Sequence, residues 1–408
     1  MIDISSKSYR KWAVWLWSFG FAIAAADRLS VALGSLQISY SYFFFTLAFI
    51  LCLLAEKKEF SLRVALYRIH DVAIYGPWRF LLLYLLWTAI FAPFTNDRVT
   101  SIIFNLGGWF SLLAVGFSAE LILCERSIRG SVFVPERLRI PFLLYSLAMI
   151  LLFFLFGLRL FFPNSGLPNL NQDPVNLLLY FSFGFPFLLW DFLKAHRRLI
   201  ARRYSGLAII FGMAVLILIG RRFFYLSAIF FLASLASLTL YKERGRLRFF
   251  LPLLSLSALC FAFVAVFYLY MSKNTTSLLA HEFLRARELV ELRLLTTITN
   301  TWDALWHTRF LGLGLGLSPL QRGLWSRLLV ESGVVGFVLY GCYFADLLLG
   351  LYRVRHAPRV IVSNVAFLSA LYFIFIGNRY LLNPYGAYIW AWYAIWTVFS
   401  AYYRKKEV

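Results

Sequence analysis

Charged residues are scarce in this chain of 408 residues. They make up 14% of the sequence, whereas hydrophobic residues make up 61%. Soluble globular proteins carry roughly 25% charged residues. A soluble domain of this length cannot bury so much apolar surface, so the composition excludes an ordinary soluble protein.

Features that cross-link or divide soluble domains are also few. The four cysteines all fall inside apolar runs, without metal-ligand spacing or a disulfide partner in a loop, and we expect them to be small apolar fillers. No Gly/Ser-rich or Pro-rich linker is present, so residues 1–408 are expected to form a single membrane domain. Further spans follow the first apolar run, which argues against a cleavable signal peptide.

Long apolar runs are what the chain has instead. About 20 apolar residues cross the ~30 Å hydrocarbon core as a helix, which satisfies its own backbone polar groups. The runs predict an all-α polytopic membrane protein of about 12 transmembrane helices. The predicted spans are 12–29, 36–55, 78–94, 101–124, 140–163, 175–193, 205–220, 223–241, 249–271, 328–352, 360–378 and 386–403. A large outer, periplasmic loop with amphipathic helices, 272–325, lies between helices 9 and 10.

Basic residues are divided unequally between the two sides of these spans. The chain has 40 Lys and Arg against 19 Asp and Glu, a net charge of +21. With the N-terminus inside, 26 of the 40 fall in inner connections. Because cytoplasmic loops carry the excess of Lys and Arg, this predicts a multi-pass protein of the bacterial inner membrane with both termini cytoplasmic. Most of the positive charge is then a topology signal, and no nucleic-acid partner is expected.

Twelve basic residues remain on the outer side, and eleven of them are Arg. They concentrate in the tight turn Arg221–Arg222 and in the loop 272–325 with the residue just beyond it. The second group contains Arg285, Arg287, Arg293, Arg309, Arg322 and Arg327. Two plainer interpretations remain open. Arginines at a membrane boundary also snorkel to water, and the alternating Glu and Arg of 278–295 also suit a solvated amphipathic helix.

Arginine suits an anionic head group because its fork binds phosphate oxygens bidentately and never loses its charge. On the outer face of a bacterial inner membrane, the leading candidate for such a substrate is a polyprenyl diphosphate-linked glycan. Its diphosphate would lie at the interface, where these arginines are predicted.

Glycine alternates with leucine in Phe310-Leu-Gly-Leu-Gly-Leu-Gly. A nucleotide-binding fingerprint would need a strand before it and a helix after it, and ATP and NAD are absent from an outer loop. We interpret Gly312, Gly314 and Gly316 as a tight, flexible re-entry of the chain toward the membrane.

Three motifs in residues 205–340 occur in a suggestive order. The first is Leu218-Ile-Gly-Arg-Arg-Phe-Phe-Tyr-Leu. The second is Glu291-Leu-Arg293, followed by His307 and the glycine-rich segment. The third is Leu328-Leu-Val-Glu-Ser-Gly-Val-Val-Gly336. Together with the span count and the large outer loop, they resemble the superfamily of O-antigen ligases and O-antigen polymerases.

The resemblance implies transfer of a glycan en bloc from undecaprenyl diphosphate to an acceptor sugar hydroxyl, with no cofactor and no metal. By motif position, Arg222 or Arg221 and Arg293 would hold the diphosphate leaving group. The further arginines expected to bind the diphosphate or glycan are Arg285, Arg287, Arg322 and Arg327. Glu331, an acid at the start of a span, is expected to pair with a loop arginine.

The implied partners are the undecaprenyl diphosphate-linked oligosaccharide and an acceptor glycan, which is a second lipid-linked repeat unit or lipid A-core. The lipid bilayer surrounds the protein, and a chain-length regulator protein is a candidate partner.

One position departs from the ligase pattern. Ligases carry a His eleven residues before the first Gly of the Gly-x-x-Gly pair, and counting back from Gly333 reaches Arg322. This favours a polymerase over a ligase and leaves the general base open. The candidates are His281, Glu282, Glu288, Glu291, Asp303 and His307.

Other classes of membrane protein fit less well. Enzymes that use polyprenyl monophosphate sugars usually carry an acidic pair in the first outer loop, where this chain has only Asp27-Arg28. A peptidoglycan polymerase of the shape, elongation and division type would place an essential Asp in the large loop; Asp303 is the candidate, but the motifs around it do not match. A transporter or flippase needs ionisable groups or broken helices at mid-membrane. The main candidates for buried acids are Glu120 and Asp346, and both are expected near an inner end.

Overall fold

In the computed structural model, the described residues are 6–24, 26, 30–33, 36–59, 70, 76–95, 97–127, 130–133, 135–161, 174–194, 203–212, 299–317, 324–354, 365–371, 373–374 and 386–401. The fold and the site below concern these residues. The predicted spans 223–241 and 249–271, and all of the loop 272–325 except 299–317 and 324–325, lie outside them.

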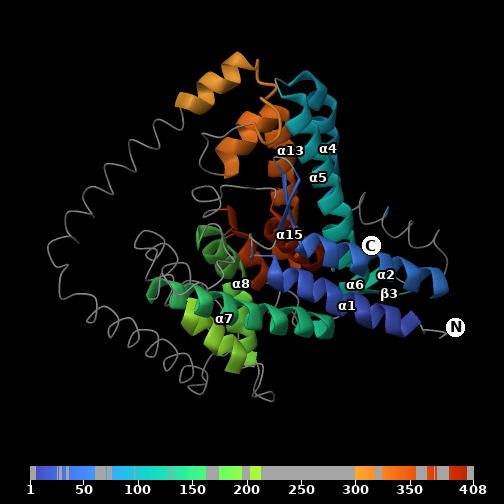
Figure 1. Ribbon diagram of the computed structural model, residues 1–408. Helices are drawn as coiled ribbons and strands as arrows, with labels where there is room; N and C mark the ends of the chain where they lie inside the picture. Colours follow the sequence, from blue (N-terminus) through green and yellow to red (C-terminus); the bar gives the residue numbers. More distant parts are fainter. Residues whose placement is uncertain are drawn as a thin grey trace, which may run out of the picture.

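The described part of the chain is helical apart from two short antiparallel hairpins. The labelled helices are α1 (Ser6–Ile23), α2 (Ser41–Glu59), α4 (Trp78–Phe91), α5 (Arg98–Ser111), α6 (Ser118–Leu123), α7 (Arg139–Phe161), α8 (Pro174–Lys194), α13 (Leu324–Val354) and α15 (Ala387–Ala401). The hairpins are β1 (Ser30–Leu33) with β2 (Leu36–Ser39), and β3 (Cys124–Ser127) with β4 (Gly130–Phe133). In Figure 1, α4, α5 and α13 run side by side, and α1, α2 and α7 cross below them.

Three short helical turns complete the element order. They are the 3₁₀ turns η1 (Ala92–Phe94) and η3 (Pro135–Leu138), and the π-helical turn η2 (Leu112–Phe117). Because η2 joins α5 to α6 without a break, Arg98–Leu123 forms one continuous apolar helix.

Helix α5 turns its apolar side outward. Val99, Ile102 and Leu106 are exposed on it, at the three- and four-residue spacing of one helix face. Its polar side is buried: Asn105 donates from Nδ2 to the Thr88 hydroxyl at 2.7 Å. A soluble helix shows the reverse pattern, with polar residues facing water, whereas buried polar side chains join helices in membranes.

In the described part of the chain, three helical stretches are long and apolar enough to cross a membrane: Arg98–Leu123, Arg139–Phe156 and Leu324–Arg353. Shorter apolar helices cover Ser41–Glu56, Trp78–Phe94 and Leu179–Phe192. Each of the six overlaps a predicted span. The apolar helices and the outward apolar face of α5 agree with a membrane-embedded protein.

One boundary expected from the sequence is wrong. The span predicted from residue 36 begins instead with strand β2, and helix α2 starts at Ser41. The Ser39 hydroxyl accepts from the Ser41 backbone N–H at 3.3 Å. Leu36 and Ile38 alternate with polar Gln37 and Ser39, which is the period-two pattern of a strand. The hydrophobicity of Leu36 and Ile38 alone suggested that the helix begins at residue 36.

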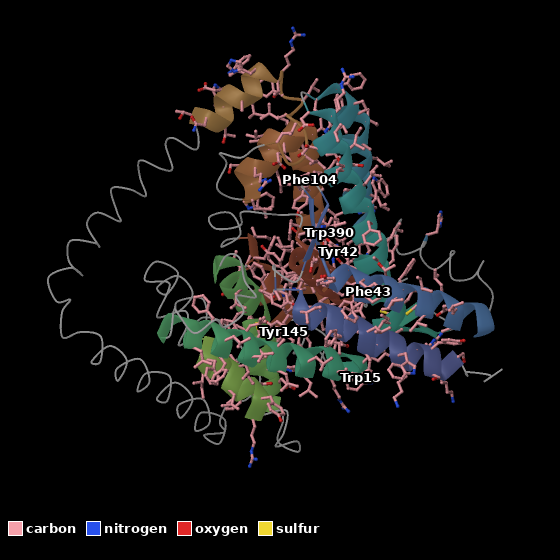
Figure 2. The ribbon with its side chains drawn as sticks, viewed as in Figure 1. Trp15, Tyr42, Phe43, Phe104, Tyr145 and Trp390 are labelled. Carbon is pink, nitrogen blue, oxygen red and sulfur yellow. The ribbon has the colours of Figure 1, made fainter. Side chains whose placement is uncertain are left out.

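Aromatic rings fill the core where α1, α7, α8 and α15 meet. Phe21 lies between Tyr145 and Trp392, with ring centroids 5.4 and 5.2 Å away. Tyr145 donates its hydroxyl to the Tyr180 carbonyl at 2.9 Å, and Tyr180 donates to that of Phe21. Figure 2 shows Tyr145 within this ring-rich region. Both of these buried tyrosine hydroxyls thus have an acceptor, as a low-dielectric interior favours.

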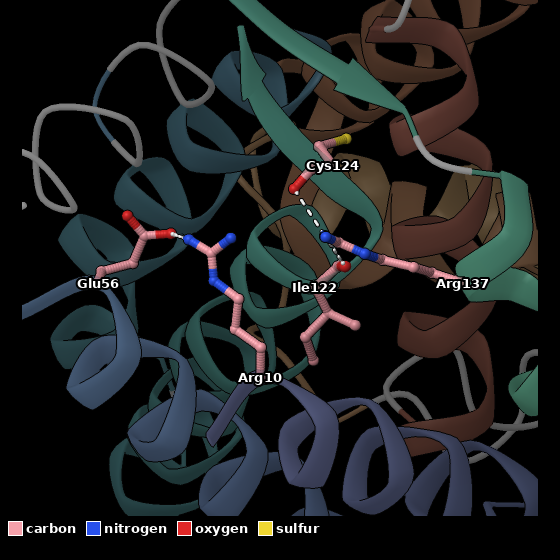
Figure 3. Close-up of polar contacts among 5 residues, drawn as sticks. All are labelled: Arg10, Glu56, Ile122, Cys124 and Arg137. Carbon is pink, nitrogen blue, oxygen red and sulfur yellow. Dashed lines mark hydrogen bonds and ion pairs between the residues drawn. The ribbon is translucent and has the colours of Figure 1, made fainter. Parts of the chain in front are cut away.

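Charged contacts tie the helices together at the end of the molecule that carries the N-terminus of α1 and the β3–β4 hairpin. Arg10 on α1 donates to Glu56 on α2 at 2.9 Å. Arg137 donates to the Ile122 and Cys124 carbonyls at 2.9 and 3.3 Å (Figure 3). Ile122 lies in the last turn of α6, where carbonyls have no intrahelical donor, and Cys124 follows directly as the first residue of β3.

Helices α4 and α13 run antiparallel. Arg79, near the start of α4, lies 3.5 Å from Asp346 toward the end of α13. At the opposite end, Trp87 Nε1 donates to the Ser332 carbonyl at 2.9 Å. Asp346, considered above as a mid-membrane acid, therefore pairs with a basic residue at one end of the bundle.

Candidate functional site

A cavity of about 270 Å³ opens where the Phe91 end of α4 and the Leu324 end of α13 meet the segment 307–315. We call it the His307 cavity. It is lined by Trp87, Thr88, Phe91, Ala92, Phe94, Thr95, His307, Thr308, Leu311, Gly312, Leu313, Gly314, Leu315, Glu331 and Ser332. Aromatic rings, hydroxyls and a few ionisable groups line it together, which is the usual composition of a small-molecule site.

A break in α13 shapes one wall of this cavity. Gly333 has φ 68° and ψ −174°, so the helix is interrupted there. In an unbroken helix, the Val334 N–H would donate to the Val330 carbonyl. Here Val334 donates to the Phe310 carbonyl at 3.1 Å, and Val330 accepts from Leu313 at 2.8 Å. The glycine-rich segment therefore replaces the missing helical hydrogen bonds.

Two more carbonyls freed by the break also have donors. Glu331 accepts from the Gly314 N–H at 2.9 Å, and Ser332 accepts from the Trp87 indole, as described above. Interrupted backbone inside a membrane protein persists where other protein groups satisfy it. The broken helix and the glycine-rich segment are thus one interlocked unit.

The glycines of this unit are needed for close approach. Gly312, Gly314 and Gly316 have φ of 97°, 109° and 80°. A Cβ on Gly312 would lie 2.5 Å from the Gly333 nitrogen, closer than atoms approach. The sequence predicted a tight re-entry of the chain here, and the turn is tight because it packs against the broken helix.

The chain reaches this turn through two residues in the left-handed region. Arg309 and Phe310 have φ of 50° and 64°, and they end the helix at 299–307, where Phe310 donates to the Leu305 carbonyl at 2.8 Å. A non-glycine residue costs roughly 1–2 kcal/mol there. Such outliers cluster at functional sites because the surrounding structure has to hold them.

His307 has one ring nitrogen fixed. Its Nδ1 lies 2.7 Å from the Asp303 carbonyl one helical turn earlier. A carbonyl oxygen only accepts, so Nδ1 carries the proton in this contact. The neutral ring then keeps its lone pair on Nε2, which makes His307 a proton acceptor on the cavity lining.

Glu331 is fully buried and paired. Arg327 Nε lies 2.7 Å from Glu331 Oε1, and the two side chains are 14% and 0% exposed. This bond lies within one helix, because Arg327 belongs to α13, one turn before Glu331. Pairing of Glu331 with a loop arginine stays a prediction. The spacing of four residues places both side chains on one helix face.

Thr95 and Asp97 shape the turn beside the cavity. The Thr95 hydroxyl donates to the Ala92 carbonyl at 2.8 Å. Asp97 caps α5: its carboxylate accepts from the Thr100 hydroxyl at 2.6 Å and from the Thr100 N–H at 3.1 Å. These two hydrogen bonds hold the pKa of the exposed Asp97 carboxyl below its usual value, so it is charged at neutral pH.

Four of the residues predicted for the site are described, and they lie close together. His307 and Glu331 line the same cavity, and Arg327 is bonded to Glu331. The candidate base Asp303 is exposed one turn before His307, and its backbone carbonyl contacts that histidine. The others lie outside the described residues: Arg221, Arg222, His281, Glu282, Arg285, Arg287, Glu288, Glu291, Arg293 and Arg322.

Sequence reasoning missed Trp87, Thr95 and Ser332, which line the cavity. Trp87 lies in an ordinary apolar run, and its indole bond to α13 leaves no trace in the sequence. Thr95 could have been suspected, since it opens the polar stretch after that run.

No three His, Cys, Asp or Glu side chains in the described ranges lie together as a set that could hold a metal ion. Comparison with known protein families gives no match to this chain, and no curated protein matches its sequence. The chemistry of the site therefore has to be argued from its own residues.

The Arg327–Glu331 pair provides a stability test. Arg327→Leu removes this arginine from a buried carboxylate and should therefore destabilise the protein. Breaking a fully buried ion pair costs roughly 3–5 kcal/mol of folding stability. The cost here should be smaller, because the Arg327 side chain is partly exposed. Glu331→Leu alone should also destabilise. The double variant should lose less stability than the two single variants lose in sum. All variants should be compared by thermal unfolding in the same detergent. Strictly additive losses would show that the two side chains are not coupled.

Proposed function

We propose that this chain is an inner-membrane glycosyltransferase that moves an undecaprenyl diphosphate-linked glycan en bloc to an acceptor sugar hydroxyl on the periplasmic face. Within this class, the proposed activity is that of an O-antigen polymerase. The alternative is an O-antigen ligase with lipid A-core as the acceptor. The proposal includes twelve spans, cytoplasmic termini and a periplasmic loop at 272–325.

The observation that carries the proposal is the His307 cavity. It combines a histidine whose Nε2 can accept a proton, a buried Glu331–Arg327 pair and a broken helix. The motif containing Arg293 precedes this segment in the chain. A proton acceptor and arginines that hold the diphosphate would together suit sugar transfer from a diphosphate.

The proposed step is a nucleophilic substitution at the anomeric carbon of the donor glycan. The acceptor hydroxyl oxygen attacks the anomeric carbon of the donor glycan, and its proton passes to His307 Nε2. The bond between the anomeric carbon and the diphosphate oxygen breaks, and the electron pair stays on that oxygen. Arg293, with Arg222 or Arg221, stabilises the negative charge on the departing undecaprenyl diphosphate. Arg285, Arg287 and Arg322 remain candidates for binding the rest of the donor.

The placement of charges supports the proposed orientation. Arg10 and Arg137, assigned to inner connections, lie at one end of the Arg98–Leu123 helix, beside Ile122 and Cys124. The His307 cavity lies at its other end, beside Asp97. This is the separation expected when one end faces the cytoplasm and the other faces the periplasm.

A lipid-linked glycan transporter or flippase is the remaining alternative. Transporters also use broken helices, but place the break near mid-membrane. In α13 the break at Gly333 lies close to the Leu324 end, and Asp346 pairs with Arg79 toward the other end. Both placements favour an interfacial site over a path across the bilayer.

The test uses the purified chain with a lipid diphosphate-linked repeat unit, with and without lipid A-core. Ladders formed without core indicate a polymerase, and transfer only in the presence of core indicates a ligase. Arg293→Ala should abolish turnover and leave folding intact, with Arg353→Ala, at the far end of α13, as the matched control. Absence of any transfer by the wild type would refute the proposed function. Near-normal activity of Arg293→Ala would remove the role given to that residue.

A further inference from the structure

Three aromatic side chains lie on the helix that ends at His307 and in the turn that follows it. Trp302 and Trp306 lie four residues apart on the helix at 299–307 and are 54% and 58% exposed. Their ring centroids are 6.0 Å apart, and Trp306 lies 5.3 Å from Phe310. We call these three residues the aromatic face. Exposed tryptophans this close together form a contiguous surface large enough to contact a ligand.

The aromatic face and the cavity belong to the same turn of chain. Trp306 is followed directly by His307 and Thr308, and both of these line the cavity. Asp303 and Arg309 are exposed beside the rings. The surface therefore interleaves aromatic rings with polar and charged groups, rather than being uniformly apolar.

We infer that the aromatic face and the His307 cavity together bind the pyranose chain of the acceptor glycan. Aromatic rings carry negative charge on their faces and therefore attract the polarised C–H groups on one side of a pyranose ring. The sugar hydroxyls, which point outward from the ring, match the threonine hydroxyls and the histidine of the cavity. This inference rests on the proposed function, since it names the acceptor side of the same site.

The size of the cavity agrees with this division of the ligand. Drug-sized ligands occupy roughly 300–1,000 Å³, and the His307 cavity is smaller, at about 270 Å³. It accommodates the terminal sugar, which carries the reacting hydroxyl, while the preceding sugars stack on Trp306 and Trp302. The aromatic face thereby positions the hydroxyl at His307 Nε2.

The bilayer interface is the competing occupant, because Trp is enriched there. The flanking Asp303, His307 and Arg309 favour the glycan. Each of them can bond sugar hydroxyls, and the residues that directly follow Trp306 in the chain line a cavity that also contains threonine and serine hydroxyls. Lipid contact requires no such cavity.

The test measures binding without turnover. The full chain in lipid nanodiscs is titrated with the oligosaccharide released by mild acid from the lipid-linked glycan of the source cell. The wild type should bind saturably, and Trp302→Ala/Trp306→Ala should weaken the affinity at least tenfold. Trp302→Phe/Trp306→Phe should retain most of it. The matched control is Trp12→Ala/Trp15→Ala, which removes two exposed tryptophans from α1 and should leave the affinity unchanged.

A second measurement does not depend on the folding of a variant. The oligosaccharide should protect Trp302 and Trp306 of the wild type from oxidative labelling, and should leave Trp12 and Trp15 labelled as before. Absence of saturable binding, or absence of selective protection, overturns the inference. Quenching of Trp302 and Trp306 by brominated phospholipid, with unchanged glycan affinity in the alanine variant, assigns the face to the bilayer and also overturns it.

The two proposals fail separately. Glycan transfer with an acceptor KM that is unchanged in Trp302→Ala/Trp306→Ala refutes the aromatic face and leaves the transferase intact. Tryptophan-dependent binding without any transfer refutes the transferase and leaves a saccharide-binding site.

Discussion

Replacing His307 with glutamine should reduce glycan transfer by roughly 10²–10⁴-fold, the usual contribution of a general base. Glutamine keeps a polar side chain that can still donate to the Asp303 carbonyl, so the turn should survive. It has no basic nitrogen in place of Nε2, so the acceptor proton would pass to water. The rate should be measured with both substrates saturating and again at low acceptor concentration.

The two rates separate the possible roles of His307. Loss of a transition-state interaction lowers kcat and kcat/KM equally, whereas loss of simple binding raises KM with kcat unchanged. His70→Gln is the matched control, since His70 is exposed and lies outside the segments that line the cavity. A His307→Gln enzyme that turns over at the wild-type rate would exclude His307 as the base and direct attention to His281 or Glu291.

Gly333→Ala should disrupt the interlocked unit that the broken helix α13 forms with the glycine-rich segment. The φ of 68° combined with ψ of −174° is a conformation essentially restricted to glycine. A Cβ there would collide with the Phe310 carbonyl oxygen and lie 2.5 Å from the Leu311 carbonyl carbon. Both neighbours are backbone atoms held by the interlocked unit and cannot move aside. Strain and collision together should cost at least about 3 kcal/mol.

The control for Gly333→Ala is Gly341→Ala in the same helix. A Cβ on Gly341 meets nothing within 4 Å, and alanine favours a helix over glycine by about 0.8–1.0 kcal/mol. Thermal unfolding should therefore show a lowered midpoint for Gly333→Ala and an unchanged or slightly raised one for Gly341→Ala. Equal unfolding midpoints for the two variants would mean that the break in α13 is not required for stability. Transfer activity should also be lower in Gly333→Ala than in Gly341→Ala.

The helices could be predicted from the sequence because lipid imposes a simple rule. The expected spans 101–124 and 140–163 correspond closely to Arg98–Leu123 and Arg139–Phe161. An apolar run must form a helix to satisfy its backbone. The rule fails at Leu36–Ser39, where hydrophobic residues of period two form a strand.

The site was only partly predictable. His307 and Glu331 were singled out separately, one as a candidate base and the other as a costly acid at a span end. Nothing in the sequence says that they line one cavity, since this depends on how the glycine-rich turn docks on α13. Arg327 is bonded to Glu331 within α13, because a spacing of four residues brings the two side chains together before any tertiary contact forms.

The sequence by itself determined that the chain is apolar, helical and asymmetric in charge, because hydrophobic run length and the distribution of Lys and Arg act locally along the chain. Only the tertiary structure decided which groups bond the backbone atoms freed at Gly333, which tryptophan is among them and which residues line the cavity together. The reason is that the backbone hydrogen bonds lost at a helix break must be replaced, and the replacements, from Phe310, Leu313, Gly314 and Trp87, come from segments that meet α13 only after folding.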